Sequence, residues 1–288
     1  MPHTFTATFP IRFYECDPYG HVNNANYLRY ATQAALEACV GGGYDPTSGP
    51  TRLMLQETGI EYLRPVEYGE TLNVITRMSD WRNDDVSLEQ ELIIAGTGQL
   101  AAKVFSDWDF IGVDTLESAP TPNAIIRAFF PNNMPPESPA REPYPEPPPA
   151  PRGAFTGRRR VRWHHLNPLG YMDSAHILSL LEEVVMDSAE YVGWPMKRAE
   201  DFGFAYFAKQ HHLVFGQPAT MDDELTITTF VDDAQETQAT RHYLIQMADG
   251  ETVARAQTLW VFVDPATGRP TPIPPEWLAD FAEQMVEA

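Results

Sequence analysis

The chain has 288 residues, of which 43% are hydrophobic, so it holds enough apolar material for a core and is longer than one domain of about 100 to 200 residues. Its formal net charge of −20 disfavours a nucleic-acid or anionic-membrane partner, because those surfaces recruit clustered lysine and arginine. The two cysteines, Cys16 and Cys39, form no Cys-x-x-Cys pair, which indicates neither a disulfide framework nor a zinc site.

The N-terminal residues lack the basic start and apolar run of a secretory signal, and no apolar run approaches the length of a membrane span. Two unpaired cysteines fit a reducing compartment. We therefore expect a cytoplasmic protein without a membrane partner.

The first half predicts one helix followed by a run of strands. Residues 4–13 alternate as a strand, with Phe13 among the residues on its apolar face. Apolar residues then recur at helical spacing from Tyr27 to Ala38, and three glycines end this helix. Further strands are expected at residues 53–63, 71–80, 86–95 and 100–112, and a short proline-led helix at 122–130.

Residues 17–28, DPYGHVNNANYL, join the first strand to the helix and contain the candidate chemistry. Asp17 lies in a tight Pro/Gly turn, and Asn23 and Asn24 are good helix N-caps. The N–H groups of a helix's first turn can stabilise a carbonyl oxygen as it becomes negative, with Asp17 beside the carbonyl carbon. The alternative is structural: Asp17 and Asn23 cap the helix, and His21 is a packed turn residue.

This stretch resembles the hotdog-fold thioesterases of the 4-hydroxybenzoyl-CoA thioesterase type, whose signature is Asp-x-x-Gly-His-Val-Asn-Asn followed by Tyr three residues on. The resemblance implies an α+β fold with an antiparallel sheet wrapped around a central helix. It gives Asp17 the catalytic carboxylate position and Asn24 the position whose backbone N–H polarises the thioester carbonyl. His21 and Asn23 belong to the same catalytic turn, and the substrate-binding positions are Gly20, Val22 and Tyr27.

The pattern recurs at an offset of 150 residues, since Asp17 and Gly20 correspond to Asn167 and Gly170. Residues 131–151 contain ten prolines and predict an extended tether. We expect a hotdog domain at 1–130, a linker at 131–152 and a second hotdog domain at 153–288. The two would form an intramolecular pseudo-dimer, which could remain a monomer or pair further into a homodimer.

The second copy of the motif is altered. Asn167 replaces the carboxylate, and an amide can act neither as general base nor as nucleophile, so this site is expected to be inactive. Some thioesterases of this fold carry their carboxylate on the helix, where Glu182 and Glu183 lie. These glutamates could therefore form a second site of another type with Asn167, or simply a solvated helix face.

Residues 158–160 are three arginines in an otherwise acidic chain. Arg158 and Arg160 are candidates for binding the phosphates of coenzyme A, although a strand with exposed arginines explains the same pattern. Adjacent histidines such as His164 and His165 point to opposite faces of a strand and make poor metal ligands. We expect no metal and no cofactor, with coenzyme A entering only as part of the substrate.

Together these features predict an acyl-CoA thioesterase in which Asp17 either attacks the acyl carbon or deprotonates a water molecule. One alternative is a thioesterase that acts on acyl groups carried by acyl carrier protein, because the chain resembles the two-repeat acyl-ACP thioesterases in its overall layout. A second is a non-catalytic protein that binds acyl thioesters. Because the catalytic histidine and acid spacing of hotdog hydratases is not evident, a hydratase is disfavoured.

Overall fold

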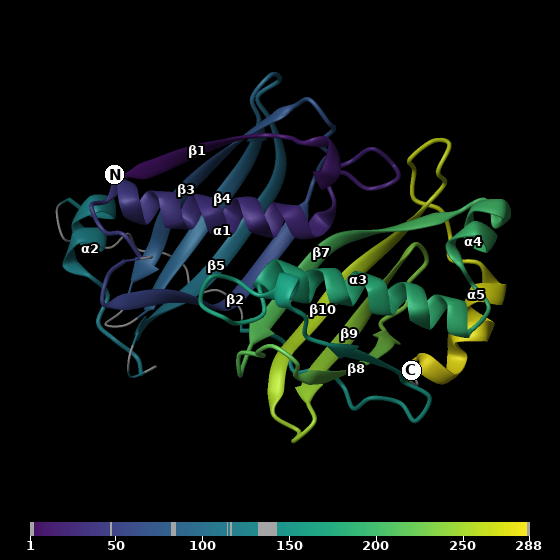
Figure 1. The fold of residues 1–288 in the computed structure, drawn as a ribbon. Helices are drawn as coiled ribbons and strands as arrows, with labels where there is room; N and C mark the ends of the chain where they lie inside the picture. Colours follow the sequence, from purple (N-terminus) through teal and green to yellow (C-terminus); the bar gives the residue numbers. More distant parts are fainter. Residues whose placement is uncertain are drawn as a thin grey trace. The chain divides into compact units, whose positions relative to one another are not determined.

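The computed structural model describes residues 3–46, 48–81, 85–113, 115, 117–131 and 143–286. The chain divides into two compact units, Met1–Pro143 and Tyr144–Ala288 (Figure 1). This division falls inside the linker expected at 131–152, of which residues 132–142 lie outside the described part of the chain. Each unit is described by itself.

The first unit is an antiparallel sheet of five strands with one long helix. Its strands lie in the order β1-β3-β4-β5-β2. The elements are β1 (Thr4–Pro10), α1 (Asn24–Gly41), β2 (Thr51–Tyr62), β3 (Thr71–Trp81), β4 (Asp85–Ile94), β5 (Gln99–Gly112) and α2 (Asn123–Phe129).

Helix α1 can lie close to the sheet because its inner face is made of small residues. Ala31, Ala34, Ala35 and Ala38 are all buried, and the helix contacts β1, β3 and β5. The buried amide of Gln90, in β4, also donates a 2.8 Å hydrogen bond to the carbonyl oxygen of Ala31. These contacts fix the position of the helix whose N-terminus belongs to the candidate site.

The first predicted strand is shorter than expected. Strand β1 ends at Pro10, and the chain makes a 3₁₀ turn at Phe13–Glu15 (η1). Phe13 is 78% exposed, so its assignment to the apolar face of the strand was wrong. The chain leaves the sheet at Pro10, but the apolar alternation in the sequence continues to Phe13. Beyond Pro10 this alternation therefore no longer corresponds to the two faces of a sheet.

The second unit repeats this plan. Its strands lie in the order β7-β10-β9-β8-β6, and its helix α3 packs against β6 and β8. A short helix, α4, follows α3 and was not predicted. The elements are β6 (Phe155–Arg160), η2 (Trp163–His165), α3 (Ser174–Tyr191), α4 (Met196–Phe202), β7 (Ala205–Phe215), β8 (Glu224–Asp232), β9 (Gln238–Met247), β10 (Thr252–Val263) and α5 (Pro275–Phe281).

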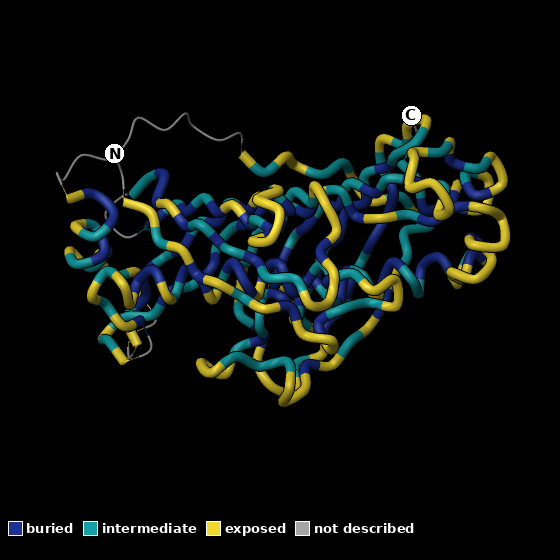
Figure 2. Tube along the Cα trace, turned by 90° about the horizontal axis from the view of Figure 1, so that it is seen from above, coloured by how far each residue is buried: buried dark blue, intermediate teal, exposed yellow. Residues whose placement is uncertain are grey.

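Burial separates the two faces of these elements. Buried residues alternate with more exposed ones along β3 and β10, and Figure 2 shows exposed stretches mainly in the connecting turns. The described end of the predicted linker also packs against the second unit. Tyr144 contacts the ring of His212 edge-on at a centroid distance of 4.9 Å, and Arg255 pairs with Glu146 at 3.3 Å.

Candidate active site

The residues of the motif form a closed loop before α1. The N–H of Asp17 donates to the carbonyl of His21 at 2.7 Å, Cys16 and Val22 form a β-bridge, and the N–H of Asn23 donates to the carbonyl of Glu15 at 2.9 Å. The pair that contains Asp17 is therefore two residue pairs away from the pair that contains Asn23, the N-cap of the helix. Along an extended chain this separation is about 7 Å. The turn and the helix start are joined rigidly by three successive pairings.

The carboxylate of Asp17 closes this turn. Its Oδ1 accepts hydrogen bonds from the N–H of Tyr19 at 2.9 Å and from the N–H of His21 at 3.1 Å. Its Oδ2 accepts none from the described residues. Gly20 has a φ of +83°, which a residue with a side chain rarely adopts, and this explains the glycine at that position.

The second turn has the same geometry without the charge. Oδ1 of Asn167 accepts from the N–H of Leu169 at 2.9 Å and from the N–H of Tyr171 at 3.3 Å, and Gly170 has a φ of +84°. The turn is thus held by the one oxygen that Asp and Asn share. The second oxygen and the negative charge of Asp17 are not needed for its shape.

The start of α1 is capped by Asn23, whose Oδ1 accepts from the N–H of Ala25 at 3.0 Å. Asn24 is the first residue of the helix, and its carbonyl accepts from the hydroxyl of Tyr62 at 3.2 Å. A helix cannot satisfy its own first N–H groups, so these groups point out of its N-terminal end. The backbone N–H of Asn24, the group expected to polarise the carbonyl, therefore follows directly on the loop that begins at Asp17.

Val22 and Tyr27 hold the loop to the body of the unit. Val22 is 4% exposed and donates its N–H to the carbonyl of Val66 at 2.8 Å. Tyr27 is 2% exposed and meets the ring of Tyr62 edge-on at 5.2 Å. Burial raises the pKa of the Tyr27 hydroxyl above its ordinary value, so this group remains protonated. Both residues lie in the core of the unit.

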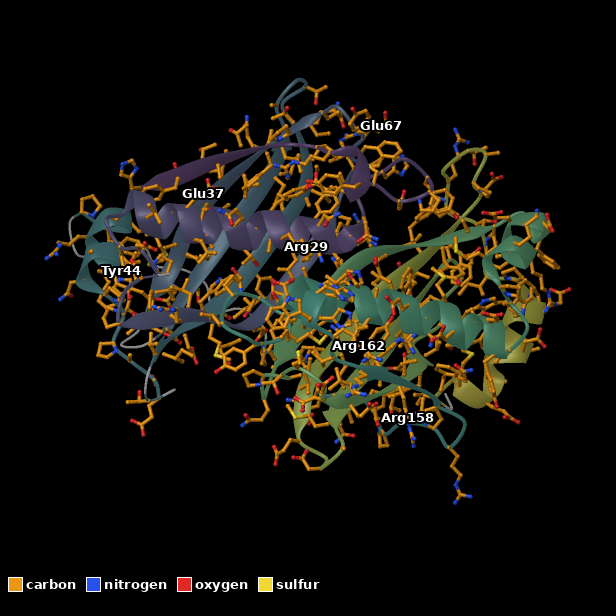
Figure 3. The ribbon with its side chains drawn as sticks, in the orientation of Figure 1. Arg29, Glu37, Tyr44, Glu67, Arg158 and Arg162 are labelled. Carbon is orange, nitrogen blue, oxygen red and sulfur yellow. The ribbon has the colours of Figure 1, made fainter. Side chains whose placement is uncertain are left out.

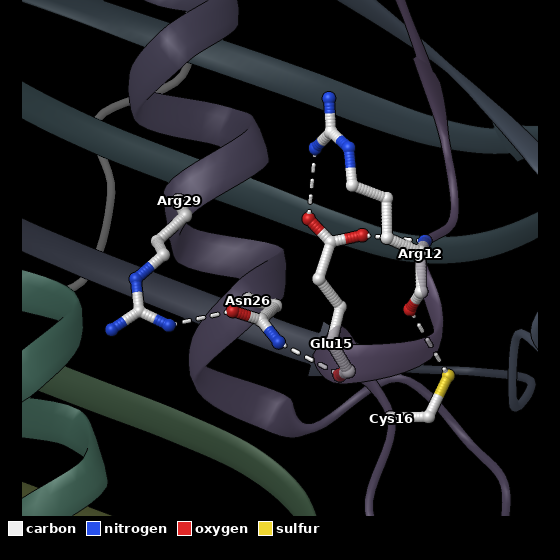
Figure 4. A network of polar contacts seen from close by, with 5 residues as sticks. All are labelled: Arg12, Glu15, Cys16, Asn26 and Arg29. Carbon is white, nitrogen blue, oxygen red and sulfur yellow. Dashed lines mark hydrogen bonds and ion pairs between the residues drawn. The ribbon is translucent and has the colours of Figure 1, made fainter.

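A polar network that was not predicted from the sequence connects η1, which precedes the loop, to helix α1, which follows it (Figure 4). Glu15, which is 9% exposed, accepts from the N–H of Arg12 at 2.7 Å and from its guanidinium at 3.1 Å. The amide of Asn26 donates to the carbonyl of Glu15 at 2.8 Å and accepts from Arg29 at 2.6 Å. The sequence signal that could have predicted this network is the spacing of Arg12 and Glu15, because an acidic residue three positions after an N-cap can accept a hydrogen bond from the N-cap's backbone N–H.

The helix-borne glutamates lie away from the second turn. Glu182 and Glu183 are eight and nine residues beyond Ser174, the first residue of α3, which is a rise of about 12 to 14 Å. Glu183 is exposed and pairs with Arg159 at 3.2 Å. No contact between Glu183 and Asn167 is present in the described part of the chain. Glu183 thus lies on an exposed helix face, whereas Glu182 is half-buried and its charge acts on the buried hydroxyl of Tyr243.

The two candidate phosphate-binding arginines differ. Arg160 pairs with Asp222 at 2.9 Å and faces Glu224 at 3.7 Å. Arg158 is exposed on the edge strand β6, and its side chain has no acidic partner among the residues that the structure describes (Figure 3). Of the pair, Arg158 is thus the one with its charge available to a phosphate.

Three histidines gather at the start of α3. Nitrogen atoms of His164, His165 and His176 lie within 4.8 Å of one another. However, Nδ1 of His165 faces the N–H of Arg162 at 3.2 Å and so acts as an acceptor, which leaves the ring proton of neutral His165 on Nε2. His165 occupies the place of Glu15 in the first repeat and caps its turn in the same way. Burial, with His164 nearby, lowers the pKa of His165 and keeps it neutral.

A family model described as the thioesterase-like superfamily matches residues 11–129 and again residues 161–281. The chain belongs to this superfamily. Each match begins before the candidate turn and ends in the short helix after the sheet, so the superfamily unit occurs twice. No curated protein matches the chain in sequence.

Solved structures share the doubled plan. An oleoyl thioesterase, as it is described, from Lactobacillus plantarum is 16% identical, with a TM-score of 0.73 over 94% of this chain and 98% of the other. The 12:0-ACP thioesterase of Umbellularia californica is 17% identical, with a TM-score of 0.71 over 90% and 94%. An acyl-ACP thioesterase of Bacteroides thetaiotaomicron is 13% identical, with a TM-score of 0.65 over 90% and 98%.

At these low sequence identities the structural similarity establishes the fold alone. Together with the two family-model matches, it confirms the prediction of two tandem hotdog domains. Superfamily membership and fold together support a thioester hydrolase. Among the described residues, no helix is long and apolar enough to cross a membrane.

Proposed function

We propose that this protein hydrolyses acyl- or aroyl-CoA thioesters to a carboxylate and free coenzyme A, with Asp17 as the catalytic carboxylate. The observation that carries the proposal is the pair of matching turns. Asn167 makes the hydrogen bonds that close its turn as Asp17 does, so the turn does not explain why the first repeat has a charged oxygen. That oxygen is the difference between the two sites that bears on a catalytic carboxylate at this position.

The reaction needs a group that attacks and a group that stabilises the oxygen of the thioester carbonyl. The N–H of Asn24, at the start of α1, would donate to that oxygen as it becomes negative, aided by the positive end of the helix dipole. Oδ2 of Asp17 would attack the acyl carbon to give a mixed anhydride that water then cleaves, or would deprotonate the attacking water. Both routes consume one water and release one thiol and one carboxylate.

Acyl carrier protein is the second candidate donor, because two of the solved structures that cover nearly the whole chain are described as acyl-ACP thioesterases. The charge of the chain favours coenzyme A. Acyl carrier proteins are acidic, and a surface with a net charge of −20 repels an acidic protein over a larger contact area than it repels a small molecule.

Turnover of one acyl group on the two donors tests the proposal. We expect release of free thiol from the CoA thioester with a kcat/KM at least tenfold above that for the carrier-protein thioester. A higher kcat/KM for the carrier-protein thioester would contradict coenzyme A as the acyl donor but would still support thioester hydrolysis. Thiol release no faster than in buffer, across a panel of acyl- and aroyl-CoA thioesters and their carrier-protein counterparts, would contradict the hydrolase and favour a binding protein.

A further inference from the structure

The second unit contains a small cavity lined by α3, α5 and the strands β7 to β10. Its walls are almost entirely apolar and include Trp260, Phe262 and Phe281. The charged residue in its lining is Arg241, which comes from β9 and is 3% exposed. A buried cation in an aromatic cavity needs an explanation, because removing a charge from water costs several kcal/mol unless it is paired.

Arg241 has no carboxylate partner in the described part of the chain. Its Nη1 donates to the hydroxyl oxygens of Ser188 at 3.1 Å and Thr229 at 3.4 Å, which leaves most of its five N–H donors without a described acceptor. The ring of Phe281 faces the guanidinium at 5.5 Å. Burial lowers the pKa of Arg241, although an arginine remains charged in proteins.

Two further donors near Arg241 also lack acceptors. Trp277 lines the cavity and is 5% exposed, and its indole N–H has no partner among the described residues. Gln284 is 1% exposed and accepts from the hydroxyl of Ser188 at 2.7 Å, whereas its amide nitrogen has no described partner. The region therefore holds an excess of buried hydrogen-bond donors and a positive charge.

The fold does not require these groups, because the first unit has apolar residues at the same places. Arg241 lies opposite Thr258, two residues before Trp260, and Leu88 lies opposite Ser106, two residues before Trp108.

The two helices show the same substitution. Trp277 and Ile125 are the third residues of α5 and α2, and Ser188 and Ala38 are the fifteenth residues of α3 and α1. Leu88, Ile125 and Ala38 are all buried in the core of the first unit. Arg241, Trp277 and Ser188 are thus additions to the second unit, whereas Thr229 has the buried Thr76 as its counterpart.

We propose that this cavity binds a small monocarboxylate with a short apolar body, its carboxylate on Arg241 and its hydrocarbon among the aromatic rings. The planar guanidinium matches a carboxylate with two parallel hydrogen bonds, which a halide cannot use. The apolar walls favour a hydrocarbon over a hydrated inorganic ion. The narrow space limits the ligand to a few carbon atoms. This binding is independent of the reaction at Asp17.

Calorimetric titration of the full chain with sodium propionate, in a chloride-free buffer, tests the proposal. We expect saturable binding of one propionate per chain, no binding of the neutral isostere propionamide, and an affinity that falls once the acid becomes longer than the cavity. Absence of propionate binding, equal binding of propionamide, or displacement by chloride at equal concentration would overturn it. Binding that Asp17→Asn abolishes would place the ligand in the other unit and would also overturn it.

Variants locate the ligand. Trp277→Phe removes one N–H and keeps the ring, so we expect a five- to tenfold loss of affinity in a folded protein. Arg241→Met should reduce affinity at least 50-fold and, without ligand, should melt no lower than the wild type, because it removes an unpaired buried charge. The matched control is Arg255→Met, on the neighbouring strand, which should bind propionate normally. If Arg241→Met does not fold, unchanged affinity in Trp277→Phe contradicts the proposal.

Discussion

At the scale of single residues, the structural role of Asp17 can be measured separately from the catalytic role that we propose for it. Its Oδ1 closes a turn with two backbone hydrogen bonds, and asparagine does the same at position 167. We therefore expect Asp17→Asn to leave the free energy of unfolding within about 0.5 kcal/mol of the wild type. Asp17→Ala leaves two N–H groups of the turn without their acceptor and should cost about 1 to 2 kcal/mol.

Urea denaturation of the wild type and the two variants checks this. Equal destabilisation by Asn and Ala would mean that the charge itself holds the turn.

The motif at residues 17–28 could be found from the sequence because its members are close together in the chain. Arg241 could not. It lies on the inner face of β9 between Ala239 and Tyr243, and an arginine in an alternating segment normally indicates an outward position. Only the register of β9 against β10 shows that it replaces Leu88 of the first repeat.

At the scale of elements, the helix and most strands were predictable because apolar periodicity and Pro/Gly breaks coincide along the first half. The end of β1 was not, since Phe13 continues the alternation of a strand that the chain has already left. Helix α4 was not predicted either. It has seven residues, as does the predicted α2, and Pro195 precedes it as Pro122 precedes α2, so the leading proline was the signal that was overlooked.

The two long helices have unequal caps, and this makes a prediction. Asn23 accepts one helix N–H, whereas Asp173 accepts two, from Ala175 at 3.1 Å and from His176 at 3.3 Å, and places a carboxylate at the positive end of α3. We expect Asn23→Ala to cost about 1 kcal/mol and Asp173→Ala about 2 kcal/mol. Thermal and urea unfolding of both variants measures this, and an equal cost would contradict the contribution of the second bond and the charge.

At the scale of the whole molecule, the charge of −20 should slow the approach of an anionic substrate. Coenzyme A carries phosphates, so screening by salt should help it to bind. We predict that kcat/KM for an acyl-CoA rises about two- to fivefold between 10 and 150 mM salt.

Arg158, which of the two candidate phosphate-binding arginines has no described acidic partner, supplies the matched comparison. A fall in kcat/KM with salt, abolished in Arg158→Gln, would show instead that a local positive patch governs encounter.

The doubled architecture was predictable from an offset that preserves Pro, Gly and the helix pattern. The proposal that the first copy is the active one rests on Asp17 and Asn167, which the same offset places at equivalent positions.

The most direct measurement is kcat for thioester hydrolysis by Asp17→Asn beside Asn167→Ala. Both variants can be checked for folding by their melting curves. We predict that Asp17→Asn, folded as the wild type, loses at least 10²-fold in kcat, while Asn167→Ala loses less than threefold once any loss of stability is taken into account. Hydrolysis by Asp17→Asn at the wild-type rate would contradict the assignment of Asp17 as the catalytic carboxylate.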